Sequence, residues 1–167
     1  MKKFTQSNLE AAFAGESQAF MKYSIFADKA EREGLKVIAR LFRAIAFAEK
    51  VHATNHFRAL GKIKETVVNL QEAINGENYE VVEMYPAMDA VAKLQGEKTA
   101  ERSIHYAVEA EKVHEEMYSN ARKSAEAGKD IPSANVFVCP TCGHTVIGEA
   151  PDECPICGLK KSKFVEF

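Results

Sequence analysis

The chain has 167 residues, of which 46% are hydrophobic and 28% are charged, and its formal net charge is −2. This length suits one ordinary domain or a compact domain plus a very small one, and the composition is that of a globular protein that can bury a core. The small net charge gives no electrostatic case for nucleic acid or an anionic membrane as the main partner. Because no apolar run approaches the roughly 20 residues that span a bilayer and the first residues do not resemble a signal peptide, we expect a cytoplasmic protein.

The first 128 residues are rich in Ala, Glu and Lys, which favours helix. Apolar residues recur at helical spacing, and glycines follow the ends of the periodic stretches. The third stretch is less regular, because Gly76 lies inside it and Pro86 removes a backbone donor, so we expect a distorted turn there. The pattern predicts four helices: from a cap at Thr5 or Ser7 to the stop signal Glu33-Gly34, and over about 35–60, 66–95 and 97–127.

One five-residue segment occurs twice in this helical region. Ala48-Glu49-Lys50-Val51-His52 returns letter for letter as Ala110-Glu111-Lys112-Val113-His114. Each copy is a Glu-x-x-His motif, and residues three apart share one face of a helix. In both copies the charged pair interrupts the apolar face rather than flanking it, which predicts that both pairs point inward.

Each motif also has a glutamate about one helix pair upstream. Glu16 lies 33 residues before Glu49, and Glu80 lies 31 residues before Glu111. A strict repeat would map Glu16 onto position 78, which Glu77 and Glu80 straddle. The third helix therefore offers two carboxylates where the first offers one.

Two Glu-x-x-His helices and a glutamate from each of two others form the ligand set of a carboxylate-bridged dimetal four-helix bundle. Burying unpaired carboxylates costs several kcal/mol each, and two divalent cations would neutralise four of them. Oxygen and imidazole ligands suit iron or manganese, although zinc can occupy such a site. After oxidation the two metals would carry two more positive charges, which the surplus glutamate would help to neutralise. We therefore expect a redox-linked rearrangement at the third helix. The competing interpretation is a rotated hairpin whose motif faces water.

All four cysteines lie near the carboxyl end, in Cys139-Pro140-Thr141-Cys142-Gly143 and Cys154-Pro155-Ile156-Cys157-Gly158. Paired Cys-x-x-Cys-Gly knuckles predict a tetrahedral tetrathiolate metal site. Spacing alone leaves zinc or iron open, and a structural zinc ribbon is the plainer interpretation, but attachment to a dimetal bundle favours iron. Short strands are predicted over 136–139 and 163–167. We therefore expect two domains, a helical bundle over 1–134 and a metal-knuckle β domain over 135–167.

Other polar residues give weaker signals. His56, His105 and His144 are expected to be packed, surface or turn residues rather than ligands. Tyr23 and Tyr85 could point into the bundle, and the sequence leaves open whether they only pack there or hydrogen-bond to a ligand.

Over essentially its whole length the sequence resembles the rubrerythrin family. The matching pieces are the two Glu-x-x-His motifs, the two cysteine knuckles and three further segments, Phe13–Ala19, Gly76–Glu80 and Met84–Pro86. The resemblance implies a mainly α protein, a ferritin-like di-iron four-helix bundle followed by a small rubredoxin-like domain. It also implies the ligand roles. Glu49 and Glu111 bridge two irons, Glu16 is a terminal ligand of one iron, Glu77 and His114 complete the other, and Glu80 and His52 alternate on the first iron with its oxidation state. Tyr23 and Tyr85 become hydrogen-bonding residues beside the ligands, and Cys139, Cys142, Cys154 and Cys157 hold a further iron, or zinc in some preparations.

The activity that this resemblance implies is that of a non-haem iron peroxidase, which reduces hydrogen peroxide to water in defence against oxidative stress. Electrons would come from rubredoxin or an NAD(P)H-dependent reductase, and the protein would form a homodimer or a higher homo-oligomer. No segment resembles a dinucleotide-binding loop, so we do not expect NAD(P)H to bind directly. The rival functions are a ferritin-like ferroxidase or iron-handling protein, a di-iron oxidase that uses oxygen, and an adaptor with structural metals only.

Overall fold

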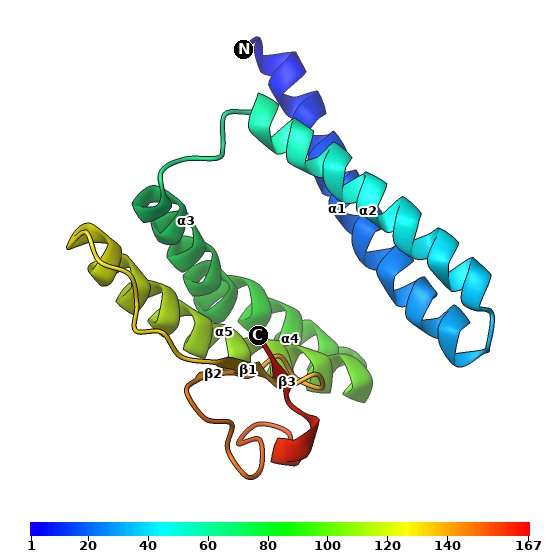
Figure 1. Ribbon diagram of the computed structural model, residues 1–167, viewed down its shortest axis with the longest axis vertical. Coiled ribbons are helices and arrows are strands. Elements are labelled where there is room, and N and C mark those ends of the chain that lie inside the picture. Colours follow the sequence, from blue (N-terminus) through cyan, green and yellow to red (C-terminus); the bar gives the residue numbers. More distant parts are fainter. The chain divides into compact units, whose positions relative to one another are not determined.

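The computed structural model describes all 167 residues and divides into two compact units, Met1–Lys64 and Glu65–Phe167. The first unit is a helical hairpin of α1 (Lys3–Arg32) and α2 (Lys36–Ala59), drawn in blue to cyan in Figure 1. The connection turns at Gly34, whose φ of 80° lies in the left-handed region that favours glycine. Aromatic side chains fill the interface, with ring centroids 4.9 Å apart for Phe13 and Phe57 and 5.7 Å apart for Phe26 and Phe42.

The start of the first helix differs from the prediction. α1 begins at Lys3, and its N-cap residue Lys2 makes no side-chain capping bond. The Gln6 amide already donates to the Lys2 carbonyl at 3.0 Å, so Thr5 and Ser7 lie inside the helix. The predicted cap at Thr5 or Ser7 is therefore wrong, because the helix extends past both residues toward the chain start.

The second unit contains the remaining helices, α3 (Thr66–Tyr79), α4 (Tyr85–Gln95) and α5 (Lys98–Glu126). Between α3 and α4 the backbone forms one stretch of π-helix, η1 (Glu80–Met84). Pro86 follows it in the first turn of α4, where its missing N–H disturbs the regular helix least. The predicted distortion is confirmed, and it takes the form of a π-helical widening, a feature frequently found at functional sites.

A three-stranded antiparallel sheet follows α5, in the order β2-β1-β3 (orange to red in Figure 1). Its strands are β1 (Val136–Val138), β2 (Thr145–Ile147) and β3 (Val165–Glu166), with a short 3-10 turn, η2 (Lys161–Lys163), before the last. The first and last strands were predicted, whereas β2 was not. The buried centre of this region is Cys139, Cys142 and Cys154, against which Tyr106, Leu159 and Phe164 pack.

No helix of the chain is both long enough and apolar enough to span a membrane.

Candidate metal centres

The first candidate centre lies on the α1–α2 hairpin. Glu16 from α1 and Glu49 and His52 from α2 bring one ligand atom each to within 4.8 Å of one another. Nδ1 of His52 lies 2.9 Å from Oε2 of Glu49, as the i, i+3 spacing on one helix face predicts. The carboxylates are partly buried while the His52 side chain is 53% exposed.

The second candidate centre has the same composition and lies on α3 and α5. Glu77 from α3 joins Glu111 and His114 from α5, again with ligand atoms within 4.8 Å of one another. Nδ1 of His114 lies 2.6 Å from Oε2 of Glu111. Each centre therefore offers two carboxylates and one imidazole, a donor set that suits iron or manganese.

The electrostatics of the second centre favour a cation. Burial and the neighbouring Glu111 carboxylate raise the pKa of Glu77 from its ordinary value of 4.5 to about 7, although His114 opposes the shift. Burial raises the pKa of Glu80 as well, and Glu111 adds to that rise. A bound cation would relieve this repulsion among carboxylates, which a set of solvated surface glutamates would not show.

The two tyrosines have different surroundings. Tyr85 opens α4 just after the π-helical segment, and its pKa is raised by burial and then by the Glu80, Glu111 and Glu77 carboxylates. Tyr23 packs in an aromatic cluster of the hairpin, with its ring 6.3 Å from that of Phe42. Tyr85 therefore lies within the electrostatic reach of the second centre.

The third candidate centre is the cysteine cluster. Sγ atoms of Cys139 and Cys157 lie 3.5 Å apart, and those of Cys142 and Cys154 lie 3.4 Å apart. Four thiolates about 2.3 Å from a tetrahedral metal stand roughly 3.8 Å from one another, so the cluster has nearly the required size. The four thiols are free rather than paired as disulfides.

The two knuckles share one backbone geometry. Cys139 N–H donates to the His144 carbonyl at 2.9 Å, and Cys154 N–H donates to the Leu159 carbonyl at 2.7 Å. The glycine after each second cysteine has a positive φ, 82° at Gly143 and 74° at Gly158. Burial alone would raise the pKa of Cys139, but backbone N–H donors from Thr141 and Cys142 lower it to about 7. The thiolate form, which binds metal, is therefore favoured at Cys139, whereas burial raises the pKa of Cys142 and Cys157.

Sequence reasoning missed the contact between the second and third centres. Nε2 of His114 lies 2.8 Å from Oγ1 of Thr145, and the Thr145 hydroxyl donates to the Gly143 carbonyl at 3.0 Å. Tyr106 from α5 packs against the cysteine cluster. No local signal could have revealed the contacts of His114 and Tyr106 with the knuckle, because they join residues 31 or more positions apart.

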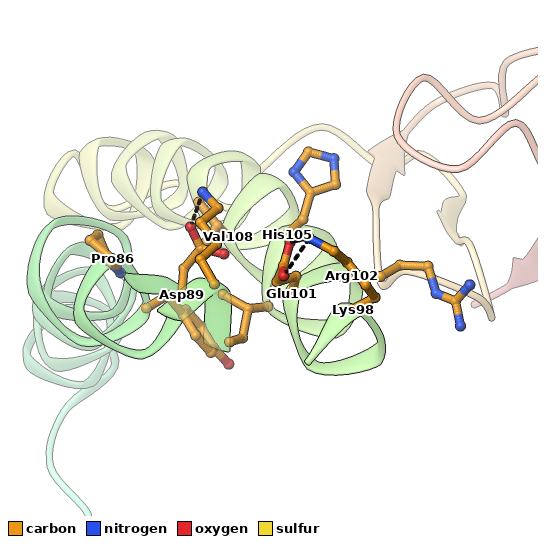
Figure 2. Close-up of a pocket in the computed structure, with 10 residues that line it drawn as sticks. Pro86, Asp89, Lys98, Glu101, Arg102, His105 and Val108 are labelled. Carbon is orange, nitrogen blue, oxygen red and sulfur yellow. Dashed lines mark hydrogen bonds and ion pairs between the residues drawn. The ribbon is translucent and has the colours of Figure 1, made fainter. Parts of the chain in front are cut away.

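A cavity of about 610 Å³ lies between α4 and α5, as Figure 2 shows. Four of its five charged side chains are paired with one another, Lys93 with Asp89 at 2.5 Å and Lys98 with Glu101 at 2.9 Å. His105 lies there rather than with the metal ligands, as expected. Apart from Tyr85, none of the candidate site residues lines this cavity.

The structure thus brings six of the seven predicted bundle ligands into two groups of three, places Glu80 beside the second group, and gathers all four cysteines. Comparison with known proteins identifies the family. Residues 7–122 match the rubrerythrin family model, and residues 137–165 match the model of the rubrerythrin rubredoxin-like domain.

Full-length relatives are similar over nearly the whole chain. Rubrerythrin-2 of Clostridium acetobutylicum is 44% identical, with 98% of this chain and 96% of the relative covered. Nigerythrin of Nitratidesulfovibrio vulgaris is 36% identical, with 98% and 86% covered. The fully reduced, all-ferrous structure of nigerythrin matches with a TM-score of 0.59 at 34% identity, covering 98% of this chain and 86% of that one.

The iron cofactors of this family, a di-iron centre and a tetrathiolate iron, fit the donor sets found here: carboxylates with imidazoles in the helices and four thiolates in the knuckles. The fold is a ferritin-like helical region followed by a rubredoxin-like domain. With the two family models in chain order and relatives that cover its full length, this chain belongs to the rubrerythrin family.

Proposed function

We propose that this protein is a cytoplasmic peroxidase that reduces hydrogen peroxide to water at a di-iron centre, with electrons that pass through its tetrathiolate iron. The observation that carries the proposal is the combination of two carboxylate–carboxylate–imidazole groups with a four-thiolate cluster on one chain. A structural zinc ribbon alone would not account for two such groups in the helices. A storage protein would not need the tetrathiolate centre as a neighbour of one of them.

The proposed ligand roles combine residues of both groups. In this proposal Glu49 and Glu111 bridge the metals, Glu16 is the terminal carboxylate of one metal, and Glu77 and His114 complete the other. Glu80 and His52 alternate on the first metal as its charge changes. The raised pKa of Glu80, which burial and Glu111 cause, supports a place for this carboxylate beside a cation, because a nearby positive charge favours its ionised form.

Reduction of one peroxide molecule to two waters consumes two electrons and two protons. Two ferrous ions can supply both electrons when they are bound. The chain's own groups would manage the protons. A glutamate with a raised pKa, such as Glu80 when it is not a ligand, takes up a proton readily, and the half-buried Tyr85 hydroxyl beside the carboxylates can donate a hydrogen bond to one of them.

Electrons would enter from another protein, and the tetrathiolate iron would pass them on one at a time. We propose rubredoxin or an NAD(P)H-dependent reductase as the donor, and a homodimer or higher homo-oligomer as the assembly. The rubredoxin-like domain implies electron transfer, which supports this choice.

The test is peroxide reduction by protein purified and loaded with iron without air. We expect about three irons per chain, two for the carboxylate groups and one for the thiolates, and a ferric tetrathiolate colour that reductant bleaches and peroxide restores. The Glu80→Ala protein should keep its iron, but its peroxide turnover should fall by at least roughly tenfold, as is usual when groups around a bound metal are changed. Glu83→Ala, an exposed glutamate in the same π-helical segment, is the matched control.

Turnover that favours oxygen over peroxide would instead indicate a di-iron oxidase. Slow turnover with mineralised iron would indicate a ferroxidase. Unchanged turnover in Glu80→Ala would show that the exchange between Glu80 and His52 is wrong.

A further inference from the structure

The two copies of the Glu-x-x-His motif have identical letters and different surroundings. In both, Nδ1 of the histidine faces the glutamate of its own motif. At its other nitrogen, Nε2, His114 has a partner within its own unit, the Thr145 hydroxyl at 2.8 Å, and His52 has none within its hairpin. The side chain of His114 is 25% exposed, against 53% for His52. The hydroxyl of Thr145 is thus a specific difference between the two histidines.

The hydrogen bonds of Thr145 favour one tautomer of His114. The Thr145 hydroxyl donates its only hydrogen to the Gly143 carbonyl at 3.0 Å. With that hydrogen used, its oxygen can accept a hydrogen bond from Nε2–H of His114, 2.8 Å away. In this tautomer Nδ1, which lies 2.6 Å from Oε2 of Glu111, carries a free lone pair, and a metal bound by both atoms would remove the repulsion between them.

Contacts with α5 hold Thr145 in place. It is the first residue of β2, and the knuckle that precedes it lies against the helix. A Cβ on Gly143 would stand only 3.6 Å from Cβ of the buried Ala110. Tyr106, on the same helix, packs against the cysteine cluster, and Cys139 N–H donates to the carbonyl of His144 just before Thr145. The hydroxyl is therefore fixed relative to His114 by both the helix and the thiolate knuckle.

We propose that Thr145 is the positioning residue that makes His114 the permanent ligand of the duplicated pair and joins it to the tetrathiolate knuckle of its own chain. The connection runs from Cys142 through the peptide to the Gly143 carbonyl, then through the Thr145 hydroxyl to Nε2 of His114. His52 has no such support within its hairpin and can leave its metal. The positioning role stands on the geometry alone, whereas a role of this connection in electron transfer rests on the proposed function.

The decisive comparison is between Thr145→Val, which removes the hydroxyl at nearly constant shape, and Thr145→Ser, which keeps it. Thr99→Val, at an exposed position in the first turn of α5, is the matched control. In zinc-loaded protein, long-range ¹H–¹⁵N spectra report which nitrogen of each histidine carries the proton and how fast it exchanges with water. We expect a slowly exchanging Nε2–H on His114 in the parent, Thr145→Ser and Thr99→Val proteins, and rapid exchange in Thr145→Val with no change at His52.

Metal affinity provides a second measurement that needs no turnover. Competition with a chelator should show that Thr145→Val weakens ferrous or zinc binding at the His114 group by about tenfold, the lower end of the usual effect of losing a ligand's hydrogen-bond partner. Thr145→Ser should restore it. Unchanged proton exchange and affinity in a folded Thr145→Val protein would overturn the positioning role.

Electron transfer is measured separately, as the rate at which the bleached thiolate colour returns after one equivalent of peroxide. A slower return in Thr145→Val at equal iron content supports the connection, and an unchanged return overturns that part of the proposal. A protein that fails to reduce peroxide while His114 still responds to Thr145→Val would contradict the proposed function and leave the positioning role standing.

Discussion

Among the individual residues, Glu77 has the electrostatic environment most typical of a metal ligand. Its carboxyl is partly buried and lies next to Glu111, and both effects raise its pKa to about 7. The sequence singled out Glu77 only as one of two glutamates that straddle the repeat position. Periodicity could place it on the right side of α3, but the strength of its interaction with Glu111 depends on the distance between two helices.

This pKa predicts how the stability of the metal-free protein depends on pH. Between about pH 4.5 and 7 the folded state holds a proton on Glu77 that the unfolded chain has already lost. The free energy of unfolding of the metal-free protein should therefore fall as pH rises through that window, and the fall should be smaller in Glu77→Gln. Urea unfolding at several pH values measures it, and a parallel pH dependence in the parent and Glu77→Gln proteins would contradict the role of this carboxyl.

At the scale of elements, local sequence signals predicted most of the helix ends and the position of the irregular segment. Glycines after the periodic stretches located the ends of α1, α2 and α5 to within about two residues, and the Gly76 and Pro86 pair located the irregular segment. The exact form of that irregularity, a π-helical stretch that begins at Glu80, was not predictable. An extra-wide turn is tolerated only because neighbouring helices compensate for it, and sequence spacing does not report such contacts.

The knuckle domain also depends on contacts that sequence shows only in part. Its buried residues are mainly the cysteines, with Leu159 and Phe164 packed around them, so it has little apolar core of its own. β2 was missed because Thr145-Val146-Ile147 is short and its pairing partner lies across a metal knuckle rather than a recognisable hairpin turn.

We therefore expect Cys154→Ser to unfold the knuckle domain while the helices remain. Loss of one of four thiolates should prevent tight metal binding, and metal binding supplies much of the folding free energy of so small a domain. Limited proteolysis should cut Cys154→Ser near residues 128–135, whereas far-ultraviolet circular dichroism at 222 nm should change little. Ser162→Ala, in the same domain and exposed, is the control. A resistant Cys154→Ser protein would show that the domain folds without its metal.

At the scale of the whole molecule, the first hairpin exposes apolar surface on the side away from its ligands. Phe47 lies about 160° around α2 from Glu49 and is 65% exposed, and Val51 on the same side is 41% exposed. Contiguous exposed apolar groups of this kind mark protein interfaces. A face that points away from the ligands is the natural place for contact with a second copy of the chain.

Phe47→Glu should therefore weaken self-association by roughly 10- to 100-fold, because burial of one large apolar side chain contributes about 1.5–3 kcal/mol. Light scattering after size-exclusion chromatography over a range of concentrations measures the change. Phe47→Leu, which keeps an apolar side chain, should behave like the parent protein. A monomeric parent, or a Phe47→Glu protein that associates as tightly, would rule out this face.

The sequence by itself determined the helices, the two Glu-x-x-His motifs, the surplus glutamate and the four-cysteine site, because each depends on spacing along a single helix or knuckle. The family resemblance already implied different roles for the two identical motifs, and only the tertiary structure shows a physical difference in their surroundings. His114 contacts Thr145 from a strand 31 residues further along the chain, and His52 has no such partner within its hairpin. A repeated motif fixes the chemistry of its own side chains, whereas the hydrogen bonds that distinguish one copy from the other come from whatever packs against it.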